Sequence, residues 1–461
     1  SKTRRELPNA RVLTEGPVEP FSRDASFSAQ HILSPLQGVA VHINAFNFPV
    51  WGMLEKISPT LIAGMPFIVK PASKTAYLTE LMVRRILEMD ILPEGALQLI
   101  SGGVGDLFNH VSGQDVVTFT GSAATGRTLR AHPAIIENAT RFTMEADSLN
   151  AAILGPDAVP GTPEFDLFVR ECTREMTVKA GQKCTAIRRI IVPKTHEAAV
   201  IEALSAKLAK TAVGLPDDEA TRMSALVSQG DRDGVREKIR ELQQDAEIVA
   251  GDPTRVDLVS GDVDKGAFMS PVLLRAAEPM AAEACHEVEP FGPVATVMAY
   301  KGPGEAAALA AKGKGSLVSS VFTNDKAVAE ELVIALAPFH GRVLIGNRAS
   351  QKSSTGHGSP LAPLVHGGPG RAGGGEEMGG MRGVKHFMQR TAVQGAPALL
   401  SAVTGQWSEG ADVRSDQHPF RKSLAELRIG DQITSTSKRI TEEDVEHFAH
   451  FTGDTFYAHM D

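Results

Sequence analysis

The first third of the chain alternates short apolar runs, rich in β-branched residues, with longer amphipathic stretches. The apolar runs predict buried strands at 38–43, 66–70, 97–101, 116–120 and 142–145. Helical periodicity predicts helices at 51–63, 75–89, 105–111 and 124–136. This alternation predicts a parallel sheet covered on both faces, with functional loops along the carboxyl edge of its strands.

The same alternation begins again near residue 149 and predicts a second α/β domain. Its strands and helices are expected at 151–155, 168–180, 187–192, 196–211, 268–274, 294–299 and 343–347. Residues 351–383 are dense in Gly, Ser, Pro and His, which predicts a long loop. The stretch 395–423 has the composition of a linker, and Thr441 is a predicted cap for a following helix.

Composition and charge narrow the class of protein. The 461 residues are 42% hydrophobic and 5% aromatic with 43 glycines, which favours a packed α/β protein of two or three domains. A net charge of −8 offers no general attraction to nucleic acid or an anionic membrane. The longest apolar runs fall short of the ~20 residues that span a bilayer, and the polar start does not resemble a signal peptide. Three cysteines form neither a disulfide framework nor a four-ligand zinc site, so we expect a cytoplasmic protein without a metal.

Cys184 is the cysteine whose neighbours favour reactivity. It lies in KAGQKCTAIRR, where Gly181 permits a close backbone approach. Positive charge favours the thiolate, the form that attacks a carbonyl carbon. The positive neighbours are Lys179, Lys183, Arg188 and Arg189. The alternative, a buried cysteine that acts as a small apolar residue, is the interpretation we give to Cys172 and Cys285.

Five segments in order along the chain resemble the signature segments of the aldehyde dehydrogenase superfamily. They are FNFP at 46–49, IVKPA at 68–72, FTGS at 119–122, GQKC at 181–184 and EPFGPV at 289–294. The resemblance implies the α/β aldehyde dehydrogenase fold, in which a Rossmann-like cofactor domain is joined to an α/β catalytic domain. We therefore assign 1–148 to the cofactor domain, 149–350 to the catalytic domain and 351–409 to a loop, an oligomerisation strand and a linker.

The resemblance also implies catalytic roles. Cys184 would attack the aldehyde, the Asn47 amide would stabilise the oxyanion, and Glu145 would activate the water that hydrolyses the thioester. Alternatively, Asn47 is a turn residue and Glu145 a carboxylate satisfied by Arg141. The family commonly follows the glutamate with Leu-Gly-Gly, whereas this chain reads MEADSLN. That ExDSLN pattern resembles a subset of the superfamily that handles CoA-linked semialdehydes.

A glycine-containing turn is expected to bind the cofactor pyrophosphate. FTGSAATG at 119–126 follows an apolar strand and opens a helix, so its backbone N–H groups can meet a phosphate. The turn differs from the GxGxxG fingerprint, as it does in aldehyde dehydrogenases. The residues assigned to it are Gly121, Ser122 and Gly126.

Two other segments are assigned to the nucleotide. In the family, the lysine matched by Lys70 contacts the adenosine ribose, and many NAD-preferring members have a glutamate where Ser73 stands. Without that carboxylate, and with Lys74 adjacent, a 2′-phosphate is tolerated, so we predict NADP rather than NAD. Glu289 matches the residue that holds the nicotinamide ribose, and Phe291 would pack beside the ring; alternatively, their segment is a simple turn.

The last residues resemble a second family. FAHFTGDTFYAHMD at 448–461 resembles the hydratase signature of MaoC-like hot-dog domains, in which Asp454 and His459 would form an acid/base pair on a CoA thioester. Residues 410–461 are thus assigned to the start of a hot-dog domain. Bifunctional enzymes of aromatic-CoA degradation join these two families, which makes a CoA-linked semialdehyde the expected substrate. Asn47 lies nearer the start than in family members, which predicts that an amino-terminal segment precedes this chain.

Two alternatives remain open. Acylating members of the family pass the acyl group to CoA instead of water, and Glu145 argues against this outcome. The fold could also serve as a catalytically silent oligomeric scaffold, against which the joint presence of Cys184, Asn47, Glu145 and Glu289 argues. Strands before 38 and after 385 suit sheet pairing between chains, so we expect a homo-oligomer.

Overall fold

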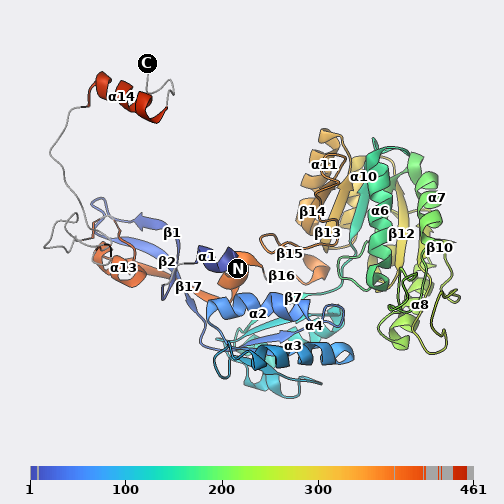
Figure 1. Cartoon of the computed structure of the whole chain (residues 1–461), viewed down its shortest axis with the longest axis horizontal. Coiled ribbons are helices and arrows are strands. Elements are labelled where there is room, and N and C mark those ends of the chain that lie inside the picture. The colour runs from blue at the N-terminus through green and yellow to red at the C-terminus, as the bar shows by residue number, and fades with distance from the viewer. Residues whose placement is uncertain are drawn as a thin grey trace. The chain divides into compact units, whose positions relative to one another are not determined.

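The computed structural model describes residues 2–7, 10–377, 379–408, 410–411, 424, 427 and 440–453. The chain divides into two compact units. One comprises Ser1–Glu6 and Pro35–Gln389, and the other Leu7–Ser34 and Arg390–Asp461. The first unit contains two large sheets, each flanked by helices (Figure 1).

The first large sheet is five-stranded and entirely parallel, in the order β5-β4-β3-β6-β7. Its strands are β3 (Ala40–Ile43), β4 (Phe67–Lys70), β5 (Leu97–Leu99), β6 (Val116–Thr120) and β7 (Arg141–Glu145). The chain runs outward from β3 to β5 and then returns to the other side of β3 as β6. Such a reversal creates a crevice at the carboxyl ends of the central strands, where open α/β sheets bind ligands. The positions of these strands confirm all five strands predicted from the apolar runs.

The connection from β5 to β6 contains a short 3₁₀ helix (Leu107–His110) in place of the helix predicted over 105–111. Helices connect the other strands, as the periodicity predicts. They are α2 (Trp51–Ala63), α3 (Ala76–Glu88), α4 (Ala123–Arg130) and α5 (Pro133–Glu137), with a short helix α1 (Lys2–Glu6) near the start. The prediction of one helix over 124–136 was wrong, because the chain forms α4 and α5 instead. Pro133 begins α5, where its missing N–H costs nothing, and the His132 ring accepts a hydrogen bond from the Ala134 N–H.

The second large sheet has seven strands in the order β10-β11-β12-β9-β8-β13-β14, and only the β10–β11 pair is antiparallel. Its strands are β8 (Ala151–Leu154), β9 (Arg189–Pro193), β10 (Ala246–Ala250), β11 (Val272–Ala276), β12 (Val294–Tyr300), β13 (Ser316–Phe322) and β14 (His340–Gly346). Its helices are α6 (Pro163–Thr177), α7 (Glu197–Leu208), α8 (Gln229–Leu242), α9 (Ala284–Glu287), α10 (Pro303–Ala311) and α11 (Lys326–Leu336).

Alternate residues of these strands build two separate cores. Ile153 and Ile191 pack with α8, α10 and α11, whereas Ala152 and Ile190 pack with α6 and α7. Because strand side chains alternate between faces, the sheet is buried on both sides, which explains its nearly continuous apolar runs.

The Gly-rich segment after β14 is only partly a loop. It contains the paired strands β15 (His366–Gly367) and β16 (Glu376–Glu377), and α12 (Gly380–His386) follows. Its glycines are needed for close backbone packing: a Cβ on Gly373 would lie 2.2 Å from the Met144 carbonyl oxygen, and Gly373 has φ +109°. The segment 351–383, predicted as a loop, thus contains the strand pair β15 and β16, and β16 packs against β7.

The second unit contains a three-stranded sheet, β1-β2-β17. Its strands are β1 (Leu13–Pro20), β2 (Ser28–Pro35) and β17 (Met388–Gly395). Helix α13 (Pro397–Thr404) lies inside the stretch predicted as a linker. Helix α14 (Glu442–Thr452) begins as predicted, with Thr441 and Asp444 forming a reciprocal capping box. None of the described helices combines the length and apolar character needed to cross a bilayer.

Candidate active site

A cavity of about 340 Å³ in the first unit gathers the residues predicted to catalyse the oxidation. Asn47 follows β3, Glu145 ends β7, and Cys184 lies in the loop before β9. Its other lining residues include Phe48, Trp51, Glu55, Lys56, Thr120, Lys179, Lys183, Thr185 and His366. The first sheet thus supplies a carboxylate and an amide at its carboxyl edge, and a separate loop supplies the thiol.

The loop that carries Cys184 has an unusual backbone. Three consecutive residues, Lys179, Ala180 and Gly181, have φ values of +54°, +51° and +68°. A Cβ on Gly181 would lie 2.1 Å from the Gly292 carbonyl oxygen, so only glycine allows this approach. The predicted tight approach at Gly181 is confirmed, and it turns the chain from α6 into the nucleophile loop.

Asn150 holds this loop in place. Its Nδ2 donates to the carbonyl oxygens of Cys184 at 2.7 Å and of Ala186 at 3.0 Å. Its Oδ1 accepts from the Val318 N–H and the Ser148 hydroxyl. Asn150 is fully buried, and sequence reasoning did not single it out, although the ExDSLN pattern contains it.

The lysines and arginines around Cys184 are largely committed to structural contacts. The Lys183 ammonium forms a buried ion pair with Glu175 at 2.7 Å, and Lys179 donates to the Asn47 carbonyl oxygen at 2.6 Å. Arg189 donates to three backbone carbonyls and is buried. The prediction that all four cations surround the thiol therefore needs correction. The charged groups of Lys179, Lys183 and Arg189 contact a carboxylate or backbone carbonyl oxygens instead.

Two arginines do interact electrostatically with the thiol. Burial lowers the pKa of Arg188 and of Arg342, and the negative charge of a Cys184 thiolate opposes that lowering at both. Arg188 also donates to the carbonyls of Gly292 and Gly181 at 2.7 and 2.8 Å. Sequence reasoning missed Arg342, because it lies on β14, far from Cys184 in the chain.

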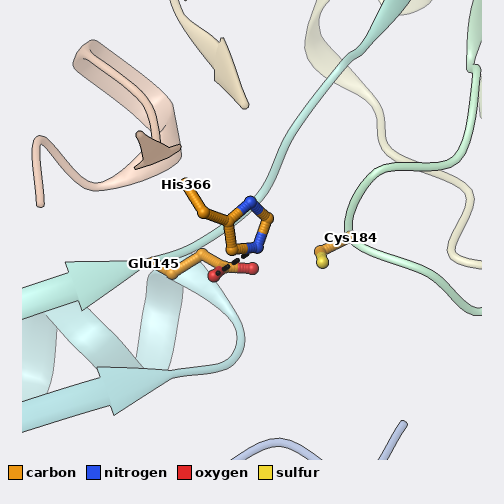
Figure 2. Close-up of side chains that lie close together, drawn as sticks. All are labelled: Glu145, Cys184 and His366. Atoms are coloured by element: carbon orange, nitrogen blue, oxygen red, sulfur yellow. Dashed lines mark ion pairs between the residues drawn. The ribbon is translucent and has the colours of Figure 1, made fainter. Parts of the chain in front are cut away.

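Glu145 is paired with a residue that the sequence did not indicate. His366 Nε2 lies 3.4 Å from Glu145 Oε2, and Figure 2 shows this pair with Cys184 facing it from a separate loop. The proposed alternative partner, Arg141, instead donates to the His386 and Met388 carbonyl oxygens at 2.8 Å. Among the described residues, the Glu145, Cys184 and His366 side chains are the group close enough to share a metal ion, their ligand atoms lying within 4.8 Å of one another.

Lys56 is a second residue that sequence reasoning missed. It is 1% exposed and lines the cavity, and its ammonium donates to Asn44 Oδ1 at 3.2 Å and to the Thr120 hydroxyl. It stands on the buried stripe of α2 with Met53 and Thr60, which follows the helical repeat. A lysine at a core-facing position of a predicted helix was the signal available in the sequence.

The predicted pyrophosphate turn lies where β6 leads into α4. The Gly121 N–H donates to the Glu145 carbonyl oxygen at 3.2 Å, and Ser122 caps α4 by accepting from the Thr125 N–H. Gly126 packs closely, since a Cβ there would lie 2.6 Å from Met144 Sδ. Asp147 Oδ1 also accepts from the Ala123 N–H at 2.9 Å, so a protein carboxylate already occupies part of this helix end.

The residues assigned to the adenosine side lie at the end of β4 and directly after it. Ser73 and Lys74 are exposed in the described structure, and burial lowers the pKa of Lys70. The Lys74 ammonium forms an ion pair with Asp231 of α8. An incoming 2′-phosphate would therefore compete with Asp231 for this lysine.

Glu289 fits the predicted contact with a cofactor hydroxyl. Its Oε2 accepts from the Ser148 N–H at 3.1 Å, and its buried Oε1 accepts no hydrogen bond from the described residues. Its Oε1 lies 3.8 Å from Arg188 Nε, and the Arg188 guanidinium lies 5.5 Å from the centre of the Phe291 ring. A buried acceptor atom without a donor is what a ribose hydroxyl would satisfy. The hydratase pair, Asp454 and His459, lies outside the described residues.

The chain belongs to the aldehyde dehydrogenase family, whose sequence model matches residues 10–393. The family predicted from the five motifs, its fold and its standing as an enzyme are thereby confirmed. Betaine aldehyde dehydrogenase from Staphylococcus aureus, solved in complex with NAD⁺, superimposes with a TM-score of 0.71. It is 25% identical, and the match covers 83% of this chain and 72% of that one.

Two relatives are more similar in sequence. The 3,4-dehydroadipyl-CoA semialdehyde dehydrogenase of Aromatoleum evansii is 47% identical over 359 residues, which are 78% of this chain and 70% of that protein. Protein MaoC of Klebsiella aerogenes is 47% identical over 243 residues, 52% of this chain and 70% of that protein. The second match is consistent with a hot-dog domain fused after the dehydrogenase.

Proposed function

We propose that this chain oxidises a CoA-linked semialdehyde to the carboxylic acid, with NADP as the hydride acceptor. The observation that carries the proposal is the meeting of Cys184, Asn47 and Glu145 in one cavity. The relative that acts on a CoA semialdehyde, at 47% identity, supports the substrate class.

The reaction follows from the three side chains. The Cys184 thiolate attacks the aldehyde carbon, and the Asn47 amide donates to the oxygen on which negative charge develops. When bound, the cofactor would supply the acceptor for the hydride released from that carbon, with Glu289 holding the nicotinamide ribose and Phe291 packed beside the ring. A thioester on Cys184 results, and Glu145 removes a proton from the water that hydrolyses it.

NADP is proposed because the cofactor edge offers no carboxylate at position 73. Ser73 is exposed shortly after the end of β4, where a glutamate would repel a 2′-phosphate. Lys70, Lys74, Gly121, Ser122, Gly126, Glu289 and Phe291 are the further residues assigned to the cofactor. We retain the sequence-based division into 1–148, 149–350, 351–409 and 410–461 as part of the proposal.

The carboxy-terminal part is proposed to belong to a MaoC-like hydratase in which Asp454 and His459 act on a CoA thioester. The pairing of the two families supports a bifunctional enzyme of phenylacetate degradation, in which hydrolysis opens the ring of oxepin-CoA and the dehydrogenase oxidises the resulting aldehyde. We also propose a homo-oligomer, since β1 and β17 are the outer strands of their sheet and can pair with another chain. Light scattering of the purified chain tests that assembly.

Product analysis tests the central proposal. The full-length chain is incubated with a CoA-linked semialdehyde and NADP⁺, and the carboxylic acid is expected in equal amount to NADPH. Free CoA is added in a parallel reaction to test the acylating alternative. Consumption of that CoA with formation of a second thioester would reject hydrolysis as the outcome, and absence of NADPH with every semialdehyde tried would reject the dehydrogenase.

A further inference from the structure

His366 lies next to Glu145, the predicted general base, and no sequence pattern indicates this contact. Its Nε2 is 3.4 Å from Glu145 Oε2, and the two side chains are 12% and 4% exposed. Figure 2 shows the imidazole beside the Glu145 carboxylate, with Cys184 across from the pair, and all three residues line the same cavity. The imidazole is thus within a small adjustment of a hydrogen bond to Glu145, and such contacts often tighten when substrate binds.

Backbone packing fixes this placement. His366 lies on β15, which pairs with β16, and β16 in turn contacts β7, the strand that ends at Glu145. The Ala146 N–H donates to the Ala372 carbonyl oxygen at 3.0 Å. A Cβ on Gly373 or Gly375 would collide with the Met144 backbone. The glycines therefore hold the strand pair, and with it His366, at a set distance from Glu145.

The surroundings of Glu145 explain why a proton acceptor is useful. Glu145 is 3% exposed and lines the cavity, so a neighbouring group that relays its proton after hydrolysis would help to restore the carboxylate. His366 also lines a neighbouring cavity of about 330 Å³. Imidazole accepts and releases protons near neutral pH, which a carboxyl group or a lysine ordinarily does not.

We propose that His366 is a positioning residue that accepts the proton from Glu145 after each hydrolysis, an inference that rests on the proposed function. Water attacks the thioester carbon, and one of its protons passes to Glu145 Oε. The carbon–sulfur bond then breaks, its electron pair returns to Cys184 Sγ, and the carboxylic acid leaves. The proton on Glu145 moves to His366 Nε2 and from there to water, which restores the carboxylate.

Rapid mixing separates this role from a structural one. His366→Gln and His366→Ala variants of the full chain are mixed with aldehyde and oxidised cofactor, and the first turnover is compared with the steady state. Hydride transfer precedes the step assigned to His366, so the initial burst of reduced cofactor is expected to stay within twofold. Steady-state turnover should fall by about tenfold to a hundredfold, and mass spectrometry should show acyl groups accumulating on the protein.

Chemical rescue and a matched control complete the test. Imidazole in the buffer should restore much of the steady-state rate of His366→Ala and should not accelerate the parent protein. His110→Gln is the control, because His110 is exposed on the first unit and its side chain keeps 72% of its accessible surface. It should behave like the parent.

Two results would overturn the inference. One is a steady-state rate in His366→Gln within twofold of the parent; the other is loss of the burst together with turnover, without rescue by imidazole. The second pattern would assign His366 to holding the cavity in shape. A parent protein that forms no reduced cofactor with any semialdehyde would instead reject the proposed function itself.

Discussion

Glu289 is a buried carboxyl group whose ionisation changes near neutral pH. Burial raises its pKa to about 7, the nearby Arg188 charge opposes this rise, and Asp147 adds to it. The folded-state pKa therefore lies above the ordinary value of 4.5. Its contribution to stability is fully present below about pH 4.5 and is lost as the pH rises through 7.

We expect Glu289→Gln to reduce this pH dependence. Between pH 5 and 8 the parent should lose at most about 3 kcal/mol of unfolding free energy through this group, and the variant should lose less. Urea unfolding midpoints of the first unit at several pH values measure the difference. Glu278→Gln, at an exposed position, serves as control. Equal pH slopes in parent and Glu289→Gln would contradict the assignment.

Cys184→Ser tests the nucleophile. A serine hydroxyl is far less acidic than a thiol, so steady-state oxidation should fall by roughly 10³-fold or more. Cofactor affinity, measured by fluorescence titration, should change little, because Cys184 contributes no predicted cofactor contact. Cys285→Ala is the comparison, since Cys285 is buried and burial raises its pKa to about 11. Normal turnover of Cys184→Ser would reject the thiol mechanism.

At the scale of elements, the segment after β7 joins the two halves of the site. Asp147 accepts from the start of α4, the Ser148 N–H donates to Glu289, and Asn150 donates to the Cys184 loop. The family's more common Leu-Gly-Gly has no side chain capable of the Asp147 contact. The departure from the family pattern therefore marks a set of specific hydrogen bonds in this protein.

Asn150→Asp tests this link with minimal change of shape. The variant loses the donor to two carbonyl oxygens and places a negative charge near the Cys184 loop. We expect a loss of about 1–3 kcal/mol in stability and a turnover reduced more strongly than cofactor affinity. Thermal unfolding and single-turnover kinetics measure the two effects. Unchanged kinetics would show that the loop holds its position without Asn150.

Cofactor preference is tested in the connection from β4 to α3. Ser73→Glu introduces a carboxylate where the 2′-phosphate is predicted, and like-charge repulsion should raise the KM for NADP by about tenfold or more. The KM for NAD should change far less. Ser73→Gln has similar size without the charge and should retain most of the NADP preference. A parent protein that prefers NAD would refute the argument before any substitution.

The elements were far easier to predict than the side-chain partners. Apolar runs located every strand of the five-stranded sheet, since a strand buried on both faces leaves a continuous signal. No sequence signal indicated the pairing of His366 with Glu145, because the two residues are 221 positions apart and are brought together by a glycine-rich strand pair. Charged neighbours in the sequence were also a poor guide to the charge around the thiol. Lys183 adjoins Cys184 in sequence, yet its ammonium pairs with Glu175.

At the scale of the whole molecule, the proposed oxidation site is contained in one unit. The residues that line its cavity run from Ala45 to His366, all inside the segment Pro35–Gln389. The segment that follows β17 contributes α13, whose end is closed locally by hydrogen bonds of Ser408 to Ser401 and Pro397. A cut after Ala411 would leave those contacts intact.

We therefore expect a chain ending at Ala411 to oxidise the semialdehyde at a rate within twofold of the parent. Every side chain assigned to the oxidation would remain, and the proposed hydratase pair, Asp454 and His459, would be absent. A chain ending at Gln389 is the comparison, because it removes most of β17 and should lose the three-stranded sheet. NADPH formation and thermal unfolding of both chains provide the measurement. Loss of oxidation in the chain ending at Ala411 would show that later residues complete the site.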